Sequence, residues 1–207
     1  MRIFVYVDGF NLYYRALKGT PHKWLNLDLL AKRLVRPDDA ISLIRYFTAR
    51  VKARAGDADA PRRQQLYLNA LGTVQNVEFH FGTFLSKTKR RPLADVPTRF
   101  VEILDTEEKG SDVNLAVHLV NDAWSNHFDV ALVLSQDTDL IEPLRMVSKG
   151  VGKPVGLIWL DSRRPDKGMA NAATFVRHIG RADLVASQFP DQIKRSGQPP
   201  IQKPKGW

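Results

Sequence analysis

Carboxylate side chains follow two strongly apolar segments of the sequence. Asp8 comes directly after residues 3–7, a run of β-branched and aromatic side chains, and Asp137 and Asp139 closely follow a second apolar run at residues 130–134. Unbroken runs of this kind are typical of strands that are covered on both faces of a parallel sheet. Because ligands bind at the carboxyl ends of such strands, we expect these three carboxylates to meet at one edge of the sheet.

Two more oxygen-bearing side chains are expected at the same edge. Asn11 lies just beyond Asp8, where Gly9 lets the chain turn, and Asp112 lies in the first turn of a helix predicted to begin at Ser111. A cluster that offers only oxygen atoms suits Mg²⁺ or Mn²⁺, which could polarise a phosphodiester, activate water and stabilise the leaving oxygen. The alternative for each acid is purely structural, since Asp favours helix N-caps and stabilises the first helical turn.

The charge balance favours a polyanionic partner. Lysine and arginine outnumber aspartate and glutamate by 31 to 22, which gives a net charge of +9 and a pI near 9.9. Four of the basic residues crowd a segment predicted to be a loop, residues 86–97, and a fifth precedes the helix at Ser111; they are Lys87, Lys89, Arg90, Arg91 and Lys109. We therefore predict an acidic pocket inside a basic rim that contacts nucleic acid.

The elements that must position these residues alternate between strands and helices. We predict strands over residues 3–7, 41–51, 77–85, 99–105, 130–134 and 154–160, and helices over residues 10–17, 26–35, 61–71, 111–124, 140–148 and after Asp166. The helix at 111–124 should bury Val113, Ala116, Val117, Val120 and Trp124, which recur at helical spacing. This alternation predicts an α/β fold with a mainly parallel sheet and helices on both faces.

Composition and length exclude several classes of protein. The 207 residues contain no cysteine, so disulfides, thiolate metal sites and cysteine nucleophiles are excluded. No membrane span or signal-peptide pattern is found, and we expect a soluble cytoplasmic protein in one compact domain. From Pro190 onward the sequence is rich in Pro, Gly, Gln and Lys, so we expect a flexible basic tail over residues 188–207 that adds nothing to the core.

Three sequence motifs carry a resemblance to a known family. They are Val-Asp-Gly-Phe-Asn-Leu-Tyr at 7–13, Lys-Gly-Ser-Asp-Val-Asn-Leu-Ala at 109–116 and Val-Leu-Ser-Gln-Asp-Thr-Asp-Leu at 133–140. Together they resemble the NYN domain of the PIN-like nucleases, in its bacterial LabA-like branch. The resemblance implies a three-layer PIN-like nuclease domain over residues 1–187. It also implies a metal-dependent ribonuclease with catalytic residues at Asp8, Asn11, Asp112, Asp137 and Asp139, of which the four aspartates would hold Mg²⁺ or Mn²⁺.

The chain departs from the family pattern at two points. Gln136 stands where the family usually has glycine, so the loop before Asp137 must turn without that residue's conformational freedom. Many PIN nucleases also have a glutamate after an early helix, and here Glu107 or Glu108 could take its place. We consider these two residues as alternatives.

The hypothesis is hydrolysis of RNA, with DNA not excluded as a substrate and a homodimer as one possible assembly. The main alternative is a non-catalytic RNA-binding module of the same fold, in which the acids hold a structural metal or only cap helices. A haloacid-dehalogenase-type phosphatase would need a second acid where Phe10 stands, and a dinucleotide-binding fold would need a glycine fingerprint after the first strand. Both are disfavoured.

Overall fold

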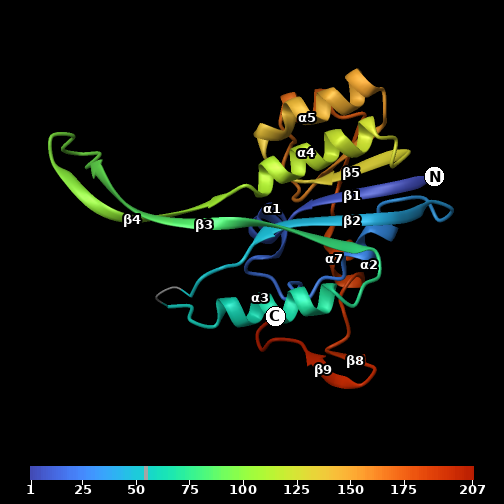
Figure 1. Cartoon of the computed structure of the whole chain (residues 1–207), viewed down its shortest axis with the longest axis horizontal. Coiled ribbons are helices and arrows are strands. Elements are labelled where there is room, and N and C mark those ends of the chain that lie inside the picture. The colour runs from blue at the N-terminus through green and yellow to red at the C-terminus, as the bar shows by residue number, and fades with distance from the viewer. Residues whose placement is uncertain (54–55) are drawn as a thin grey trace.

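A central sheet organises the computed structural model, which describes residues 1–53 and 56–207 (Figure 1). Within the described residues the sheet has seven strands in the order β4-β3-β2-β1-β5-β6-β7, and all neighbours are parallel except the antiparallel pair β3 and β4. The strands are β1 (Arg2–Asp8), β2 (Ala40–Ala49), β3 (Val77–Pro92), β4 (Phe100–Lys109), β5 (Val130–Leu134), β6 (Val155–Trp159) and β7 (Phe175–His178). This confirms the predicted α/β class with a mainly parallel sheet.

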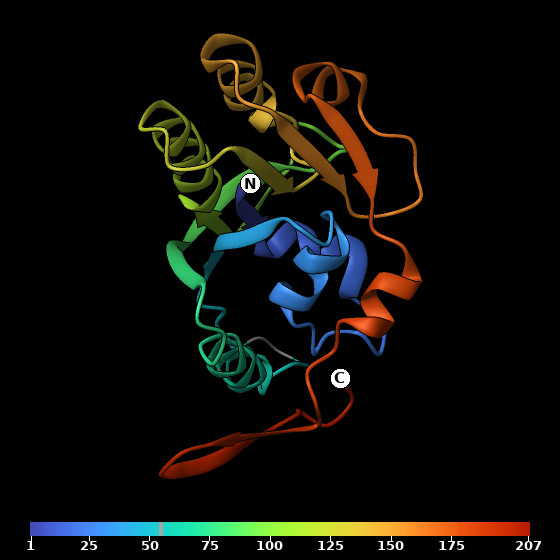
Figure 2. The ribbon, with the colours of Figure 1, turned by 90° about the vertical axis from the view of Figure 1, so that its right-hand side faces the viewer.

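Helices cover both faces of the sheet and complete the predicted three layers (Figure 2). One face packs against α1 (Gly9–Leu12), the π-helical turn η1 (Tyr13–Leu17), α2 (Leu27–Arg33), α3 (Ala60–Leu71) and α7 (Arg181–Ala186). The other packs against α4 (Ser111–Trp124), η2 (Thr138–Leu140), α5 (Ile141–Arg145), η3 (Met146–Val151) and α6 (Lys167–Ala172). Successive β1 side chains alternate between the two cores, with Val5 in the first and Tyr6 in the second.

The helix α2 forms as the sequence predicts. Asn26 caps it by accepting hydrogen bonds from the backbone N–H groups of Asp28 and Leu29, at 3.0 and 3.2 Å. Leu27, Leu30, Ala31 and Leu34 recur at helical spacing and are buried together. Its burial against the sheet gives this short helix most of its stability, since an isolated helix of this length is unstable in water.

The helix α4 is present, but its predicted buried face is only partly correct. Of the residues predicted to be buried, Ala116 and Val120 pack against the core and are partly buried. Val113, Val117 and Trp124 are 65%, 60% and 77% exposed, whereas Leu115, Leu119 and Ala123 are buried together with Ser111 and Asp122. Both stripes of this helix are apolar at helical spacing, so periodicity alone does not decide which one faces the sheet. The inward stripe is chosen because Asp122 finds buried partners there.

The segment predicted as a basic loop is instead part of a long β-hairpin, and that prediction is wrong. The strand β3 continues through Lys87 to Pro92 and pairs with β4 from Thr83 opposite Lys109 to Pro92 opposite Phe100. Figure 1 shows this hairpin, which we call the arm, extending away from the body of the molecule. Cross-strand pairing supplies the backbone hydrogen bonds that a loop would leave to solvent.

The C-terminal segment also departs from the prediction. It forms the hairpin β8 (Gln192–Arg195) and β9 (Gln198–Gln202), which lies beside α3 (Figure 2). Ile201 is only 3% exposed and belongs to the core, and the ring of Trp207 lies 5.8 Å from that of Tyr67. The expectation that residues beyond Pro190 add nothing to the core is therefore wrong. Separately, none of the helices in the described part of the chain has the length and apolarity needed to span a membrane.

Candidate functional site

Asp8 lies at the carboxyl end of β1 and is almost completely buried. One carboxylate oxygen accepts a hydrogen bond from the backbone N–H of Asn11 at 2.9 Å, and the other accepts from the hydroxyl of Ser135 at 2.9 Å. Burial raises the pKa of Asp8, and the hydrogen bonds from Asn11 and Ser135 oppose that rise. Asp8 therefore does cap α1, as the structural alternative predicted, and it is also fixed toward β5.

Backbone and side-chain contacts tie the end of β1 to the end of β5. In the parallel register Val7 pairs with Leu134, so both strands end at the same level. The side-chain oxygen of Asn11 accepts from the backbone N–H of Gln136 at 3.2 Å, and Asp137 accepts from the backbone N–H of Asp139 at 3.0 Å. Among the described non-glycine residues only Asn126 has a positive φ. Gln136 consequently turns the chain without the conformational freedom of glycine.

Glu108 and Asp112 approach the same edge from the base of the arm and the start of α4. The Glu108 carboxylate accepts from the backbone N–H and the hydroxyl of Ser111, at 3.2 and 2.6 Å. Gly110 adopts a φ of 99°, which favours glycine, and its turn brings Asp112 into the first helical turn. Ser111 is the first helical residue, as predicted, and Glu108 accepts a hydrogen bond from its N–H.

These residues face one pocket, which we call the acidic pocket. It is lined by Asp8, Phe10, Asn11, Tyr14, Phe84, Glu108, Ser111, Asp112 and Asp137. Four of the five residues predicted to be catalytic thus line this pocket, and the fifth, Asp139, lies outside the lining. Glu108 joins the pocket, whereas Glu107 instead pairs with Lys89 and Lys109 on the arm. The structure therefore separates the two glutamates that the sequence left as alternatives.

The charges in the acidic pocket act on one another. The pKa of Asp112 is raised to about 6. Burial is the largest cause, and the nearby carboxylates of Asp8, Asp137, Glu108 and Asp139 raise it further. Asp139 thus remains electrostatically coupled to the pocket without lining it. Within residues 1–53 and 56–207 none of these five carboxylates forms an ion pair with lysine or arginine. Among the described residues, therefore, no lysine or arginine in contact with these carboxylates offsets their repulsion.

The oxygen atoms of the acidic pocket are of the type that binds a hard divalent cation, but they do not surround a position for one. In the described part of the chain, no three acidic or histidine side chains are grouped closely enough to hold a metal ion between them. Mg²⁺ does not need such a cage, because it keeps several waters and is commonly bound through one or two carboxylates plus substrate phosphates. Carboxylate oxygens that lack cationic partners match that mode of binding.

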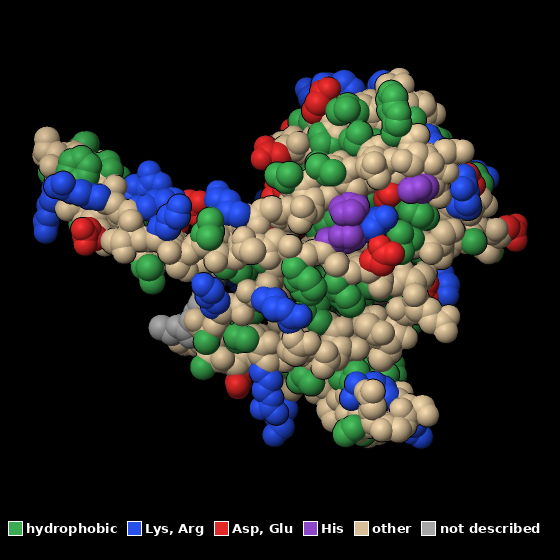
Figure 3. All heavy atoms as spheres, in the orientation of Figure 1, with side chains coloured by type: hydrophobic (Ala, Val, Ile, Leu, Met, Phe, Trp, Pro, Cys, Tyr) green, Lys and Arg blue, Asp and Glu red, His purple; other side chains and the backbone are tan. Residues whose placement is uncertain are grey.

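The predicted basic rim is divided between the two faces of the arm. Side chains alternate along paired strands, so Lys87, Lys89, Arg91 and Lys109 lie on one face, and Arg90 lies on the face that carries Phe84 and Glu108. Lys89 pairs with Asp105 at 2.7 Å and with Glu107, and Lys109 pairs with Glu107 at 2.9 Å. These lysines lower the pKa of Glu107 to about 2. Figure 3 shows basic side chains along the arm.

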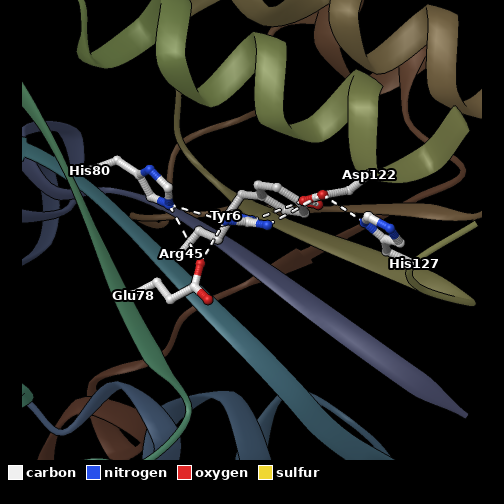
Figure 4. A network of polar contacts seen from close by, with 6 residues as sticks. All are labelled: Tyr6, Arg45, Glu78, His80, Asp122 and His127. Carbon is white, nitrogen blue, oxygen red and sulfur yellow. Dashed lines mark hydrogen bonds and ion pairs between the residues drawn. The ribbon is translucent and has the colours of Figure 1, made fainter. Parts of the chain in front are cut away.

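Sequence reasoning missed a polar network on the α4 face of the sheet (Figure 4). The buried carboxylate of Asp122 accepts hydrogen bonds from the Tyr6 hydroxyl at 2.7 Å and from Arg45 Nε at 2.9 Å, and it contacts His127 Nδ1 at 3.1 Å. Arg45 also pairs with Glu78 and contacts His80. Burial alone would raise the pKa of Asp122, but the bonds from Tyr6, His127 and Arg45 lower it. The network lies outside the lining of the acidic pocket.

The fold and the acidic edge of the sheet define a PIN-like α/β domain. The family model of the NYN domain matches residues 2–179, and the chain belongs to this family, which is part of the PIN-like nuclease superfamily. This confirms the resemblance seen in the three motifs.

Two individual proteins are also similar to the chain. It is 29% identical, over an alignment 237 positions long, to 6-hydroxy-3-succinoylpyridine 3-monooxygenase HspA of Pseudomonas putida, and the alignment covers all of this chain and 75% of that protein. A crystal structure of a protein of unknown function from Vibrio parahaemolyticus superposes with a TM-score of 0.57 at 14% identity, covering 87% of this chain and 93% of that one. The second likeness concerns the fold alone.

Proposed function

We propose that the protein hydrolyses phosphodiester bonds of RNA at the acidic pocket, with the help of Mg²⁺ or Mn²⁺. The observation that carries this proposal is the convergence of Asp8, Asp112, Asp137 and Glu108 on one pocket, without cationic partners among the described residues. A divalent cation bound there would polarise the phosphate and lower the pKa of a bound water. Membership of the NYN family, which is typically nucleolytic, supports the proposal.

The protein's own groups hold the site in shape. Asp8 is fixed by Asn11 and Ser135, and the Asn11 side chain in turn holds the backbone of Gln136. Asp137 and Asp112 therefore face the pocket from two elements whose positions are set by hydrogen bonds and strand register. This preorganisation is what a hydrolytic site needs, because a displacement of about 1 Å can lower a rate substantially.

A cleavage assay tests the proposal. Labelled RNA and DNA are incubated with wild type and with Asp137→Asn, in Mg²⁺, in Mn²⁺ or in chelator. We expect the substitution to slow cleavage of RNA roughly a hundredfold or more, as the loss of one charge-stabilising group does in other enzymes. Asp161→Asn is the matched control, because Asp161 follows the neighbouring strand β6 but pairs with Arg163 outside the pocket. Equal cleavage by wild type and Asp137→Asn would refute the assignment.

A second measurement tests the metal without requiring turnover. If the pocket carboxylates repel one another, millimolar Mg²⁺ or Mn²⁺ should raise the Tm of the wild type, because a ligand that binds only the folded state stabilises it. Asp112→Asn should raise the Tm in chelator and reduce the metal-induced rise. Asp38→Asn, at an exposed site, serves as the control and should change neither value. Absence of any metal-dependent shift would favour a purely capping role for the acids.

A second candidate function comes from the Pseudomonas relative, a monooxygenase that matches the whole of this chain. Such a reaction inserts one atom of O₂ into the substrate, reduces the other to water and takes two electrons from a donor. The test incubates the protein with 6-hydroxy-3-succinoylpyridine, O₂ and an electron donor. Substrate-dependent oxygen uptake, together with unchanged RNA, would replace the ribonuclease proposal with this one.

A further inference from the structure

A second cavity lies directly beside the acidic pocket. It has a volume of about 160 Å³, and six aromatic side chains line it: Phe10, Tyr13, Tyr14, Tyr46, Phe84 and Trp207. A cavity of roughly 150 Å³ is large enough to bind an aromatic ring the size of benzene. We call this cavity the aromatic pocket. The proposed hydrolysis does not by itself account for it.

The two pockets share a wall. Phe10, Tyr14 and Phe84 line both of them, and the rings of Phe10 and Phe84 pack edge to face with centroids 5.7 Å apart. Tyr14 is half exposed, so it stands at the boundary between the two openings. A single ligand can therefore place a flat ring in the aromatic pocket and an adjoining group in the acidic pocket.

Polar and charged groups complete the aromatic pocket. The buried Tyr46 and Thr48 contribute hydroxyl-bearing side chains to its lining, and Lys52 and Arg63 contribute positive charge. Arg63 pairs with Asp57 at 2.5 Å, while Lys52 is exposed. Flat apolar walls, a few polar groups and nearby cations are the features with which proteins hold the bases of a single nucleic-acid strand.

We propose that the aromatic pocket binds one unpaired nucleobase of an RNA strand whose neighbouring phosphate lies in the acidic pocket. This inference rests on the proposed ribonuclease function and names its substrate class as single-stranded RNA. A base inside a duplex is stacked on both faces and paired along its edge, so it cannot enter a walled cavity without being extruded. The aromatic pocket thus selects against paired RNA.

Binding in chelator tests the proposal without cleavage. Fluorescence anisotropy compares a labelled single-stranded RNA with the duplex of the same sequence. Two variants act on the pocket: Tyr14→Ala removes one of the three aromatic side chains of the shared wall, and Ala60→Phe fills the cavity from the start of α3. The control is Trp124→Ala, which removes an aromatic ring that is 77% exposed on α4. Tm measurements with and without Mg²⁺ report whether each variant folds and keeps the acidic pocket.

We expect the single strand to bind more tightly than the duplex, and we expect both pocket variants to weaken its binding by about fivefold to a hundredfold, the value of one stacked base. Trp124→Ala should bind like wild type. Equal affinity for single strand and duplex, or unchanged binding by both pocket variants, would overturn the proposal. Competitive displacement of the RNA by 6-hydroxy-3-succinoylpyridine, lost in Ala60→Phe, would assign the cavity to a small aromatic acid instead.

Cleavage and binding distinguish the two proposals. If the wild type cleaves RNA but the pocket variants bind it normally, the base-binding pocket is wrong and the ribonuclease stands. If the single strand binds through the aromatic pocket but no metal supports cleavage, the ribonuclease is wrong and the base-binding pocket stands.

Discussion

The ion pair between Arg45 and Asp122 joins the sheet to α4, and histidines surround it. The Arg45 side chain is 13% exposed and that of Asp122 is 1% exposed, so water screens their attraction only weakly. His80 and His118 lie against this pair, with ring centroids 4.1 Å apart. The pKa of His80 is lowered to about 4. Burial is the largest cause, His118 and Arg45 lower it further, and the carboxylates of Glu78 and Asp122 oppose the shift. The pKa of His118 is lowered as well.

This arrangement predicts that His80 destabilises the folded protein in mild acid. The unfolded chain protonates His80 near pH 6.5, whereas the folded protein does so only near pH 4, so the unfolded state binds more protons between these values. The contribution of His80 to the free energy of unfolding should therefore fall by about 2 kcal/mol between pH 7 and pH 5. Asp112, whose pKa is raised to about 6, contributes with the opposite sign in the same range, so the effect of His80 is obtained by comparing variants. Urea denaturation at the two pH values measures it.

The variant His80→Gln should flatten that pH dependence, because it removes the titrating group. His22→Gln is the control, because His22 is not one of the six residues of the network in Figure 4. An unchanged pH dependence in His80→Gln would show that other groups dominate acid destabilisation.

At the scale of single residues, sequence reasoning predicted the carboxylates of the acidic pocket better than those of the network. Asp8 directly follows one apolar run and Asp137 lies three positions after the end of another, so strand direction places both at one edge of the sheet. Asp122 sits within an amphipathic helix, where an acid is expected on the solvent side. Its partners Tyr6 and Arg45 lie on strands distant in sequence, and only the folded register brings them together.

At the scale of elements, the arm is the feature that most changes the predicted nucleic-acid surface. Arg90 stacks on Phe100 at 4.8 Å, and Lys87 and Arg91 are exposed, whereas Lys89 is engaged by Asp105 and Glu107. The four basic residues that the sequence grouped together are therefore not equivalent. Those without carboxylate partners in the described structure remain available to phosphates.

This difference predicts unequal effects on salt-dependent RNA binding. Replacing Lys87, Arg90 and Arg91 together by alanine should reduce the slope of log affinity against log salt by about 2, because each lost contact with single-stranded nucleic acid contributes about 0.7. Lys89→Ala should leave the slope nearly unchanged, since its ammonium group contacts carboxylates. Titrations in chelator at several salt concentrations measure both slopes. A reduction of about 0.7 in the slope by Lys89→Ala, the value of one phosphate contact, would contradict the division of the arm.

The arm also shows which kind of strand the sequence pattern does not predict. The sequence from Ser86 to Pro92 is almost entirely polar or basic, which favours a loop. It is a strand because a second strand lies beside it over its whole length, and cross-strand pairs stabilise residues that have no buried face. Alternation within one segment gives no information about such a partner.

At the scale of the whole molecule, the C-terminal hairpin extends the hydrophobic core around Trp24. The indole N–H of Trp24 donates to the carbonyl of Pro190 at 2.9 Å, and its ring packs against Phe189 and Trp207. Ile201 belongs to the same core cluster, on the face of the sheet that carries α3. The end of the described chain is thus held by apolar contacts with segments near its beginning.

Removing one of these contacts should destabilise the whole domain. Ile201→Ala should lower the free energy of unfolding by about 2 to 4 kcal/mol, the usual cost of truncating a buried isoleucine. Gln202→Ala, at the exposed neighbouring position, should change it by less than about 0.5 kcal/mol. Urea denaturation compares the two. Similar small effects would mean that β8 and β9 are only loosely coupled to the core.

Most of the architecture follows from the sequence, because buried parallel strands and the helices between them carry strong local patterns. The strands β1, β5 and β6 are unbroken apolar runs, and each ends at an acid or shortly before one. The strand β7 and the hairpin β8–β9 lack such a pattern, since they are short, polar and stabilised by neighbours. The acidic pocket was predictable because two of its carboxylates follow these apolar strands. The aromatic pocket was not predicted from the sequence.

The bonds that close the acidic pocket join residues far apart in the chain, with separations of 127 positions for Asp8 and Ser135 and 125 for Asn11 and Gln136. During synthesis the first carboxylate therefore emerges long before its companions, and a nascent chain that ends before Asp137 cannot assemble the pocket. A fragment that lacks either Asp8 or Ser135 likewise cannot form the bond between them. The proposed activity thus depends on both parts of the chain folding together.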